Sequence, residues 1–256
     1  MADANFNLSR RSVIAGTAVA GAGLVAVAVK AAHSPSRPPA AAVRPLTPTS
    51  AAMPVAFLMD DGITMIDFAG PWEVFQDAWD GNNPRFSLFT VASTSDEIQT
   101  TGNILAGSGA DMKMSGLKFR PDYTFDNAPQ PKVIVIGAQA HGANPAKLDW
   151  IRRAAANADV VMSVCTGAFV LASTGLLDGL SATTHHDSYD RFAEQFPKVK
   201  LMRGTRFVDN GKFITAGGLT SGIDTALHVV NRYLGSANTE QVAYYMEYRG
   251  NEWRNA

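Results

Sequence analysis

The sequence predicts an α/β protein built in three layers, with a mostly parallel central sheet between helices. Short apolar runs without polar alternation are typical of strands buried on both faces, and four occur, at residues 55–59, 86–92, 133–136 and 160–164. Helical stretches separate these runs, and the alternation of strand and helix implies βαβ units with right-handed crossovers. We therefore expect most strands to lie parallel in one sheet.

Six helices are expected between and after these strands. Pro71 suits the first position of a helix, so the first helix is placed at residues 71–79. The others are expected at residues 145–157, 166–174, 188–196, 221–234 and 239–248. The segment 198–216 has shorter apolar runs and an Asp-Asn-Gly turn at residues 209–211, a pattern that favours a hairpin leading back into the sheet.

The N-terminal residues are distinct from the folded part. Ser-Arg-Arg-Ser-Val-Ile at residues 9–14 resembles a twin-arginine export signal, and residues 17–29 carry no charge. We assign residues 1–30 to a twin-arginine signal peptide, 31–53 to a Pro/Ala-rich linker and 54–256 to one domain. The signal predicts a periplasmic or secreted protein whose partner during export is the twin-arginine (Tat) translocase. The alternative is an uncleaved signal that anchors the protein in the membrane.

Composition excludes several classes of protein. The 22 Lys and Arg residues balance 23 Asp and Glu residues, so no nucleic-acid partner is expected. The single cysteine can form neither an internal disulfide nor a zinc site built on several thiolates. The five histidines show no HExxH pattern, so no dedicated metal site is expected.

Cys165 follows the apolar run 160–164 and precedes the small residues Gly167 and Ala168. A cysteine at such a strand-to-helix turn lies at the carboxyl end of the sheet, where parallel α/β proteins bind ligands, in the position of a nucleophile elbow. The helix N-terminus is expected to stabilise a thiolate, and the N–H groups of Thr166 and Gly167 to hold a developing anion. The alternative is a buried, inert cysteine.

Asp67 is one carboxylate among apolar residues shortly after the run 55–59. Partial burial there would raise its pKa and let it exchange a proton with a neighbouring thiol. The alternative is a helix-entry residue that accepts hydrogen bonds from backbone N–H groups.

Two pairs of small residues follow other predicted strands. Gly137 and Ala138 come after residues 133–136 and could supply N–H groups to an oxyanion hole, although such loops are also ordinary turns. Gly217 and Gly218 follow the hairpin and are expected to line the pocket. The pattern beyond them, a Ser and an Asp three residues apart at 221–224, is first of all a helix-capping pattern.

His185 and His186 follow the segment 180–184. We expect His185 within reach of Cys165 as a base or orienting group, and Asp187 next to it could orient a histidine. The alternative is a polar pair that decorates the end of a strand.

Taken together, these segments resemble the ThiJ/PfpI superfamily. The resemblance is carried by residues 67–75 (DFAGPWEVF), 163–168 (SVCTGA), 175–177 (GLL), 182–185 (ATTH) and 215–224 (TAGGLTSGID). It spans about residues 55–248 and is similar in particular to the isonitrile hydratase branch. It implies a class I glutamine-amidotransferase-like, flavodoxin-like sandwich, commonly a homodimer. AraC-type regulators carry the same block but continue into a helix-turn-helix domain, so we do not expect a transcription factor from a chain with an export signal that stops at Ala256.

The resemblance also implies roles for single residues. Cys165 is the nucleophile, Asp67 its acidic partner, and Thr166 a neighbour that positions substrate or water. For an isonitrile, a small electrophilic substrate, Asp67 protonates the terminal carbon, the thiolate attacks it, and water releases an N-substituted formamide without metal or organic cofactor. Two departures change the expected pocket: Ile-Gly-Ala at residues 136–138 replaces the usual Pro-Gly-Gly, and His186 replaces an aromatic residue, which makes the pocket more polar.

Three functions stay open at this point. The first is a cysteine-dependent hydratase or lyase for small carbon electrophiles, with isonitriles as the named candidate. The second is a glyoxalase-like hydratase, deglycase or amidase that uses Cys165 and His185. The third is a non-enzymatic protein whose thiol senses oxidants or binds a ligand.

Overall fold

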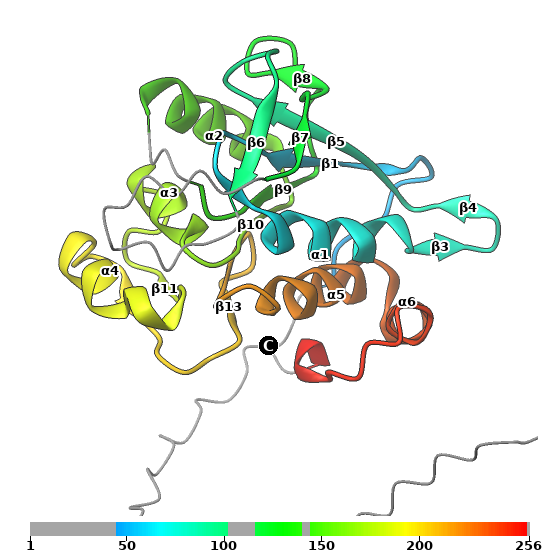
Figure 1. Ribbon diagram of the computed structural model, residues 1–256. Coiled ribbons are helices and arrows are strands. Elements are labelled where there is room, and N and C mark those ends of the chain that lie inside the picture. Colours follow the sequence, from blue (N-terminus) through cyan, green and yellow to red (C-terminus); the bar gives the residue numbers. More distant parts are fainter. Residues whose placement is uncertain (1–44, 102–115, 140–143, 255–256) are drawn as a thin grey trace, which may run out of the picture. The chain divides into compact units, whose positions relative to one another are not determined.

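The computed structural model describes residues 45–101, 116–139 and 144–254 (Figure 1). Its main sheet has seven strands in the order β13-β14-β10-β9-β1-β5-β8, and every neighbouring pair is parallel except β13 with β14. In chain order these strands are β1 (Met53–Leu58), β5 (Phe86–Ala92), β8 (Tyr123–Thr124), β9 (Val133–Ile136), β10 (Val160–Ser163), β13 (Phe207–Asp209) and β14 (Phe213–Ala216).

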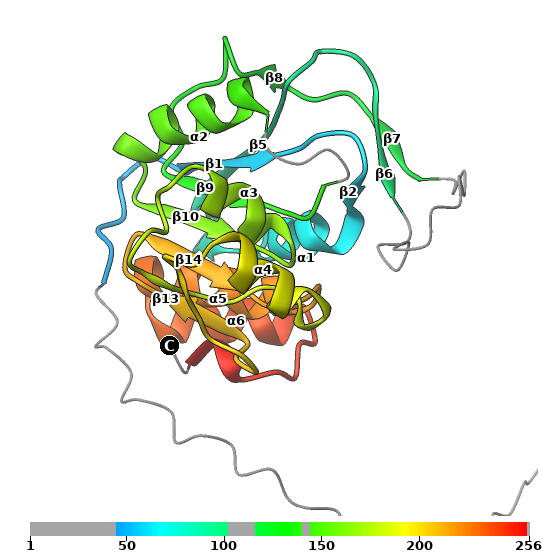
Figure 2. The ribbon, with the colours of Figure 1, turned by 90° about the vertical axis from the view of Figure 1, so that its left-hand side faces the viewer.

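Helices cover both faces of the sheet (Figures 1 and 2). One face packs against α1 (Met65–Gln76) and α5 (Ser221–Leu234), and the other against α2 (Pro145–Asn157) and α3 (Gly167–Ser173). Successive residues of one strand enter opposite cores: Phe57 joins the α1/α5 cluster and Leu58 the α2/α3 cluster. The predicted three-layer α/β class with a mostly parallel sheet is confirmed.

Smaller elements surround this sandwich. Three small sheets consist of β2 (Ile63–Thr64) with β6 (Ile98–Thr101) and β7 (Lys118–Phe119), β3 (Trp79–Asp80) with β4 (Asn83–Pro84), and β11 (Ser181–Ala182) with β12 (Lys200–Leu201). The remaining helices are α4 (Tyr189–Gln195), α6 (Ser236–Tyr245) and the single turns η1 (His186–Ser188) and η2 (Glu252–Arg254). Within the described residues, no helix combines the length and the apolar character that a membrane span requires.

The first helix begins earlier than the sequence predicts. The prediction placed Pro71 at the first helical position, but α1 starts at Met65 and Pro71 lies inside it. Proline has no N–H, so the carbonyl of Asp67, one turn earlier, receives no helical hydrogen bond from this position. Gly70, next to it, lets α1 approach α5 closely, since a Cβ there would lie 2.9 Å from Cγ1 of Ile223.

The ends of the domain also differ in detail from the prediction. The turn at residues 209–211 does join antiparallel strands, but Lys200 and Leu201 pair in parallel with β11 instead of joining this hairpin. Met53, assigned to the linker, is the first residue of β1, and Leu46 donates its N–H to the carbonyl oxygen of Arg232 at 2.7 Å. The predicted signal and most of the linker lie outside the described residues.

Candidate active site

Cys165 occupies a tight turn between β10 and α3 at the carboxyl end of the sheet. Its backbone is left-handed, with a φ of 58°, which a residue with a side chain rarely adopts. The Cys165 N–H donates to the carbonyl of Gly217 at 2.8 Å, and the Thr184 hydroxyl donates to the Cys165 carbonyl at 2.9 Å. Gly167 is required because a Cβ there would lie 2.1 Å from the carbonyl oxygen of Ile136. The strained turn is the elbow that the sequence predicts.

Asp67 lies in the first turn of α1, and its side chain is fully buried beside this elbow. The backbone N–H of Ala138 donates to its Oδ2 at 2.9 Å. Burial raises the pKa of Asp67 from 3.8 to about 7, although the hydrogen bonds from Ala138 and from the Cys165 thiol act in the opposite direction. Among the described residues, Oδ1 has no hydrogen-bond partner.

The small residues at 137 and 138 have a defined place in this arrangement. A Cβ on Gly137 would lie 3.0 Å from Cβ of Asp67, so only glycine lets the loop after β9 approach the carboxyl closely. The N–H of Ala138 binds Asp67 itself. These contacts position the acid next to the thiol.

The thiol is neutral at rest, in contrast to the thiolate that the sequence predicts. Burial, followed by the negative charge of Asp67, raises the pKa of Cys165 from 9.0 to about 12. The N–H groups of Thr166 and Leu219 and the Thr166 hydroxyl interact with the sulfur and lower the pKa, but by less. The positive N-terminal end of α3, a helix of only seven residues, does not offset the rise in the thiol pKa that burial and the neighbouring carboxylate cause. Asp67 and Cys165 therefore form one proton-sharing pair.

Leu219 is the site residue that the sequence reasoning missed. Its backbone is also left-handed, with a φ of 50°, and this turns its N–H toward the sulfur of Cys165. The residue is 40% exposed. Only the adjacent pair Gly217 and Gly218 signalled an unusual turn here, because nothing in the sequence marks a leucine with positive φ.

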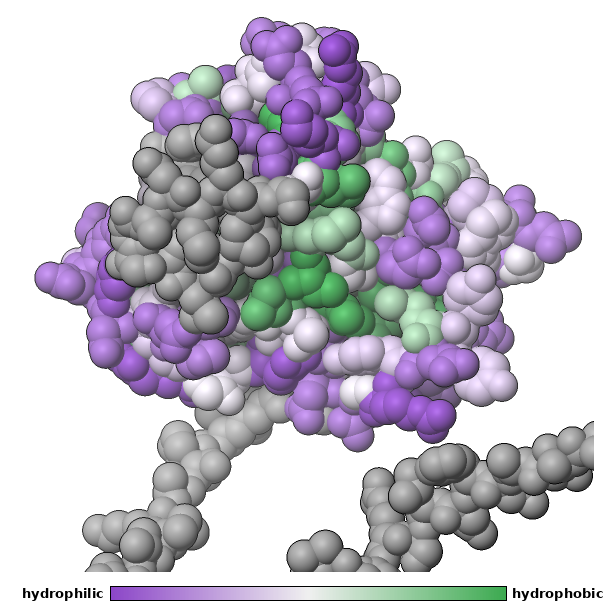
Figure 3. All heavy atoms as spheres, in the orientation of Figure 1, coloured by the Kyte–Doolittle hydropathy of each residue, from purple (hydrophilic) through white to green (hydrophobic). Residues whose placement is uncertain are grey.

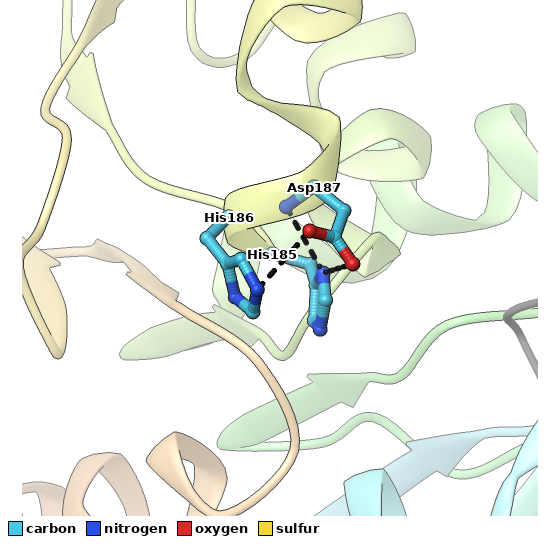
Figure 4. A group of neighbouring side chains, drawn as sticks. All are labelled: His185, His186 and Asp187. Atoms are coloured by element: carbon cyan, nitrogen blue, oxygen red, sulfur yellow. Dashed lines mark hydrogen bonds and ion pairs between the residues drawn. The ribbon is translucent and has the colours of Figure 1, made fainter. Parts of the chain in front are cut away.

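His185 lies against the Gly217-Gly218 turn, where a Cβ on Gly218 would lie 2.4 Å from its Cδ2. Burial and then His186 lower its pKa, while Asp187 acts in the opposite direction. Its Nδ1 lies 3.8 Å from Oδ2 of Asp187, so its charged neighbour is Asp187 rather than Asp67. The side chain of His186, predicted to line the pocket, is 72% exposed, with its ring stacked on His185 (Figure 4).

A hollow elsewhere in the molecule has no part in this site. A hollow of about 690 Å³ lies between α6 and the C-terminal segment, lined among others by Glu240, Tyr244, Tyr248 and Arg254. It contains none of the elbow residues, and it has no buried nucleophile. We place the candidate site at Cys165 on chemical grounds.

The fold and this elbow define a class, the flavodoxin-like α/β proteins with a cysteine at the strand-to-helix turn. Residues 53–232 match the DJ-1/PfpI family, and the chain belongs to that family. The sequence-based resemblance to the ThiJ/PfpI superfamily is thereby confirmed.

Individual relatives include enzymes and regulators. The chain is 31% identical over 205 residues to an isonitrile hydratase of Pseudomonas putida, covering 77% of this chain and 79% of that protein. It is 25% identical over 181 residues to the HTH-type transcriptional regulator CdhR of Pseudomonas aeruginosa, covering 66% of this chain and 54% of the regulator.

Solved structures share the fold. A ThiJ/PfpI family protein from Pseudomonas syringae has a TM-score of 0.65 at 24% identity, covering 86% of this chain and 84% of that one. DJ-1beta of Drosophila melanogaster has a TM-score of 0.62 at 15% identity, covering 77% of this chain and 98% of that one.

Proposed function

We propose that this protein is a cysteine-dependent hydratase or lyase for small carbon electrophiles, and that isonitriles are its substrate class. The observation that carries the proposal is the buried Asp67–Cys165 pair. The pKa values are about 7 for Asp67 and about 12 for Cys165, so the thiol holds a proton that the Asp67 carboxylate can take. The similarity to an isonitrile hydratase, at 31% identity over 77% of the chain, supports the same chemistry.

The proposed reaction uses only groups of the chain and water. The Asp67 carboxylate takes the thiol proton and delivers it to the terminal carbon of the isonitrile while the sulfur of Cys165 bonds to that carbon. The product is a thioimidate. Water adds its oxygen to the same carbon, and one of its protons goes to the nitrogen. The carbon–sulfur bond then breaks, the other proton returns to the sulfur, and the N-substituted formamide leaves. The N–H groups of Thr166 and Leu219 stabilise negative charge on the sulfur during the attack.

The surroundings of the thiol fit a substrate with an apolar substituent. Leu219 and Met65 are 40% and 47% exposed. Figure 3 shows an apolar patch over the neighbouring N-terminal ends of α1 and α5. Met65 is the first residue of α1, and Leu219 lies two residues before α5. An apolar substituent of an isonitrile would lie against this patch while its terminal carbon reaches the thiol.

The alternatives have weaker support. Oxidant-sensing cysteines are thiolates at rest, whereas the pKa of Cys165 is raised and its thiol needs the neighbouring Asp67 carboxylate as a base. A glyoxalase-, deglycase- or amidase-like reaction that needs His185 as base is less favoured, because Nδ1 of His185 faces Asp187 and, among the described residues, no hydrogen bond joins His185 to Cys165.

The test is to incubate the purified protein with a panel of isonitriles and dicarbonyls and to follow formamide by NMR. We expect formamide from wild type, none from Cys165→Ala, and a loss of at least about a hundredfold from Asp67→Asn. His185→Ala is expected to retain most activity. Because Asp67 must be ionised, kcat/KM should rise with pH up to about 7 and then level off. Equal formamide from wild type and Cys165→Ala would disprove the nucleophile.

We further propose that the chain is exported by the twin-arginine pathway, which rests on residues 9–14 and 17–29 alone. Replacing both Arg10 and Arg11 by Lys should then retain the protein inside the cell, as measured by fractionation. We also propose a homodimer, supported by the exposed side chains of Tyr244 and Tyr245 on α6. Light scattering that reports a monomer mass would refute it.

A further inference from the structure

Three consecutive residues outside the Asp67–Cys165 pair point metal-ligating atoms toward one another. Nε2 of His186 lies 3.1 Å from Oδ1 of Asp187, and Nδ1 of His185 lies 3.8 Å from its Oδ2. One ligand atom from each residue lies within 4.8 Å of the other two. Figure 4 shows both rings on the same side of the turn as the carboxylate.

These distances are close to those of a coordination site. In a tetrahedral site with bonds of about 2.0–2.1 Å, neighbouring ligand atoms are roughly 3.3 Å apart, so side-chain rotations alone can complete the site. Two imidazole nitrogens and one carboxylate oxygen suit Zn²⁺, Cu²⁺ or Ni²⁺ and leave the remaining positions to water.

The local charges also favour a cation. Among the described residues, no Lys or Arg forms an ion pair with Asp187, whose ion-pair partners are the two imidazoles. The rings of His185 and His186 are stacked, with centroids 4.4 Å apart at 27°. His185 Nδ1 also accepts the backbone N–H of Asp187 at 3.3 Å, an interaction that a bound ion would replace.

We propose that His185, His186 and Asp187 form a binding site for one divalent transition-metal ion of the zinc class. No dedicated metal site was expected from the sequence, because three adjacent ligands on one turn form none of the spaced motifs that mark metal sites. The site adjoins the elbow through Thr184, whose hydroxyl binds the Cys165 carbonyl, but it shares no ligand with the Asp67–Cys165 pair.

The test is isothermal titration of ZnCl₂ into the untagged full chain, so binding is measured without any substrate. We expect one ion per chain for wild type and for Cys165→Ser, which removes the only thiol. His186→Gln and Asp187→Asn should each weaken binding at least tenfold. Asp190→Asn, in the helix that follows and 94% exposed, is the matched control and should bind as wild type does.

Two results would overturn the site. One is the absence of saturable zinc binding by wild type, and the other is wild-type affinity in both His186→Gln and Asp187→Asn. Neither result bears on formamide production, so the two proposals fail separately.

Discussion

Asp67 binds a proton more tightly than an exposed aspartate does. Its carboxyl is buried, and the one backbone N–H of the described residues that donates to it is that of Ala138. Its ordinary pKa of 3.8 applies to the unfolded chain, and the folded value is about 7. Between these pH values the folded protein binds a proton that the unfolded chain has released. Folding stability therefore falls as pH rises through this window.

This linkage predicts a pH-dependent effect of Asp67→Asn. Each pKa unit corresponds to about 1.4 kcal/mol, so ionisable Asp67 lowers the stability of wild type by about 2 kcal/mol between pH 5 and pH 7. Asparagine cannot ionise, and the variant should gain about that much relative to wild type over the same interval. Urea unfolding at several pH values measures it, with Asp126→Asn, at an exposed carboxyl, as control. A stability difference that does not change with pH would contradict the folded pKa.

At the residue scale, sequence position identified the reacting groups but not their ionisation. Cys165 and Asp67 both follow buried strands, and parallel topology brings such positions to one edge of the sheet. The neutral thiol could not be predicted, because it depends on burial and on the mutual distance of the pair. The exposure of His186 likewise depends on which way a single turn faces.

At the scale of elements, a buried ionic network holds the loop that follows β9. Nζ of Lys147, a fully buried residue of α2, lies 2.7 Å from Oδ2 of Asp60 and donates to Oε1 of Gln139 at 2.8 Å. Gln139 in turn donates to the carbonyl of Leu58 at 3.0 Å. The adjacent residue Ala138 provides the N–H that binds Asp67. The network therefore connects α2, β1 and the acid of the candidate site.

Lys147→Met should break this network. The variant leaves Asp60 buried without its cation, so we expect a loss of about 3–5 kcal/mol of unfolding free energy. Removing both charges with Lys147→Met and Asp60→Leu should recover part of this loss, because no orphan charge remains. The released loop should also let iodoacetamide reach Cys165 faster, which is measurable because the chain has one thiol.

The matched control is Lys198→Met, whose ion pair with Asp178 has side chains 76% and 44% exposed. It should change stability by less than about 1 kcal/mol and leave the alkylation rate unchanged. If Lys147→Met behaved like this control, the network would have no part in holding the loop.

Strands were predicted better than helix ends for a physical reason. The runs at residues 86–92 and 133–136 coincide with β5 and β9, because strands buried on both faces need continuous apolar residues. The predicted start of α1 was wrong, because Pro71 is tolerated inside this helix. The helix begins directly after the two-residue strand β2. Such tolerance depends on tertiary packing, which the local sequence does not show.

At the scale of the whole molecule, both ends of the described chain meet on α5. Arg232 accepts the N–H of Leu46 at its carbonyl, and Nδ1 of His228 lies 3.1 Å from the carbonyl oxygen of Trp253. Both side chains also contact Asp209 at the β13–β14 hairpin: Nε2 of His228 lies 2.9 Å and Nη1 of Arg232 3.4 Å from its Oδ2. One carboxylate thus joins α5 to the edge of the sheet and, through α5, to both ends.

Asp209→Ala should therefore act on stability and on the C-terminal segment together. The side chains of His228 and Arg232 are 1% and 3% exposed, so removing their shared carboxylate takes the acceptor from Nε2 of His228 and the counter-charge from Arg232, which keeps its bond to the Gly211 carbonyl. This should lower the unfolding free energy by about 3–5 kcal/mol. The loosened contact with Trp253 should speed tryptic cleavage after Arg249, measured by mass spectrometry under native conditions.

Glu240→Gln is the control, because its ion pair with Arg254 has side chains 52% and 46% exposed and contributes less than about 1 kcal/mol. Faster cleavage in the control but not in Asp209→Ala would mean that the surface pair, rather than the buried carboxylate, holds the C-terminal segment.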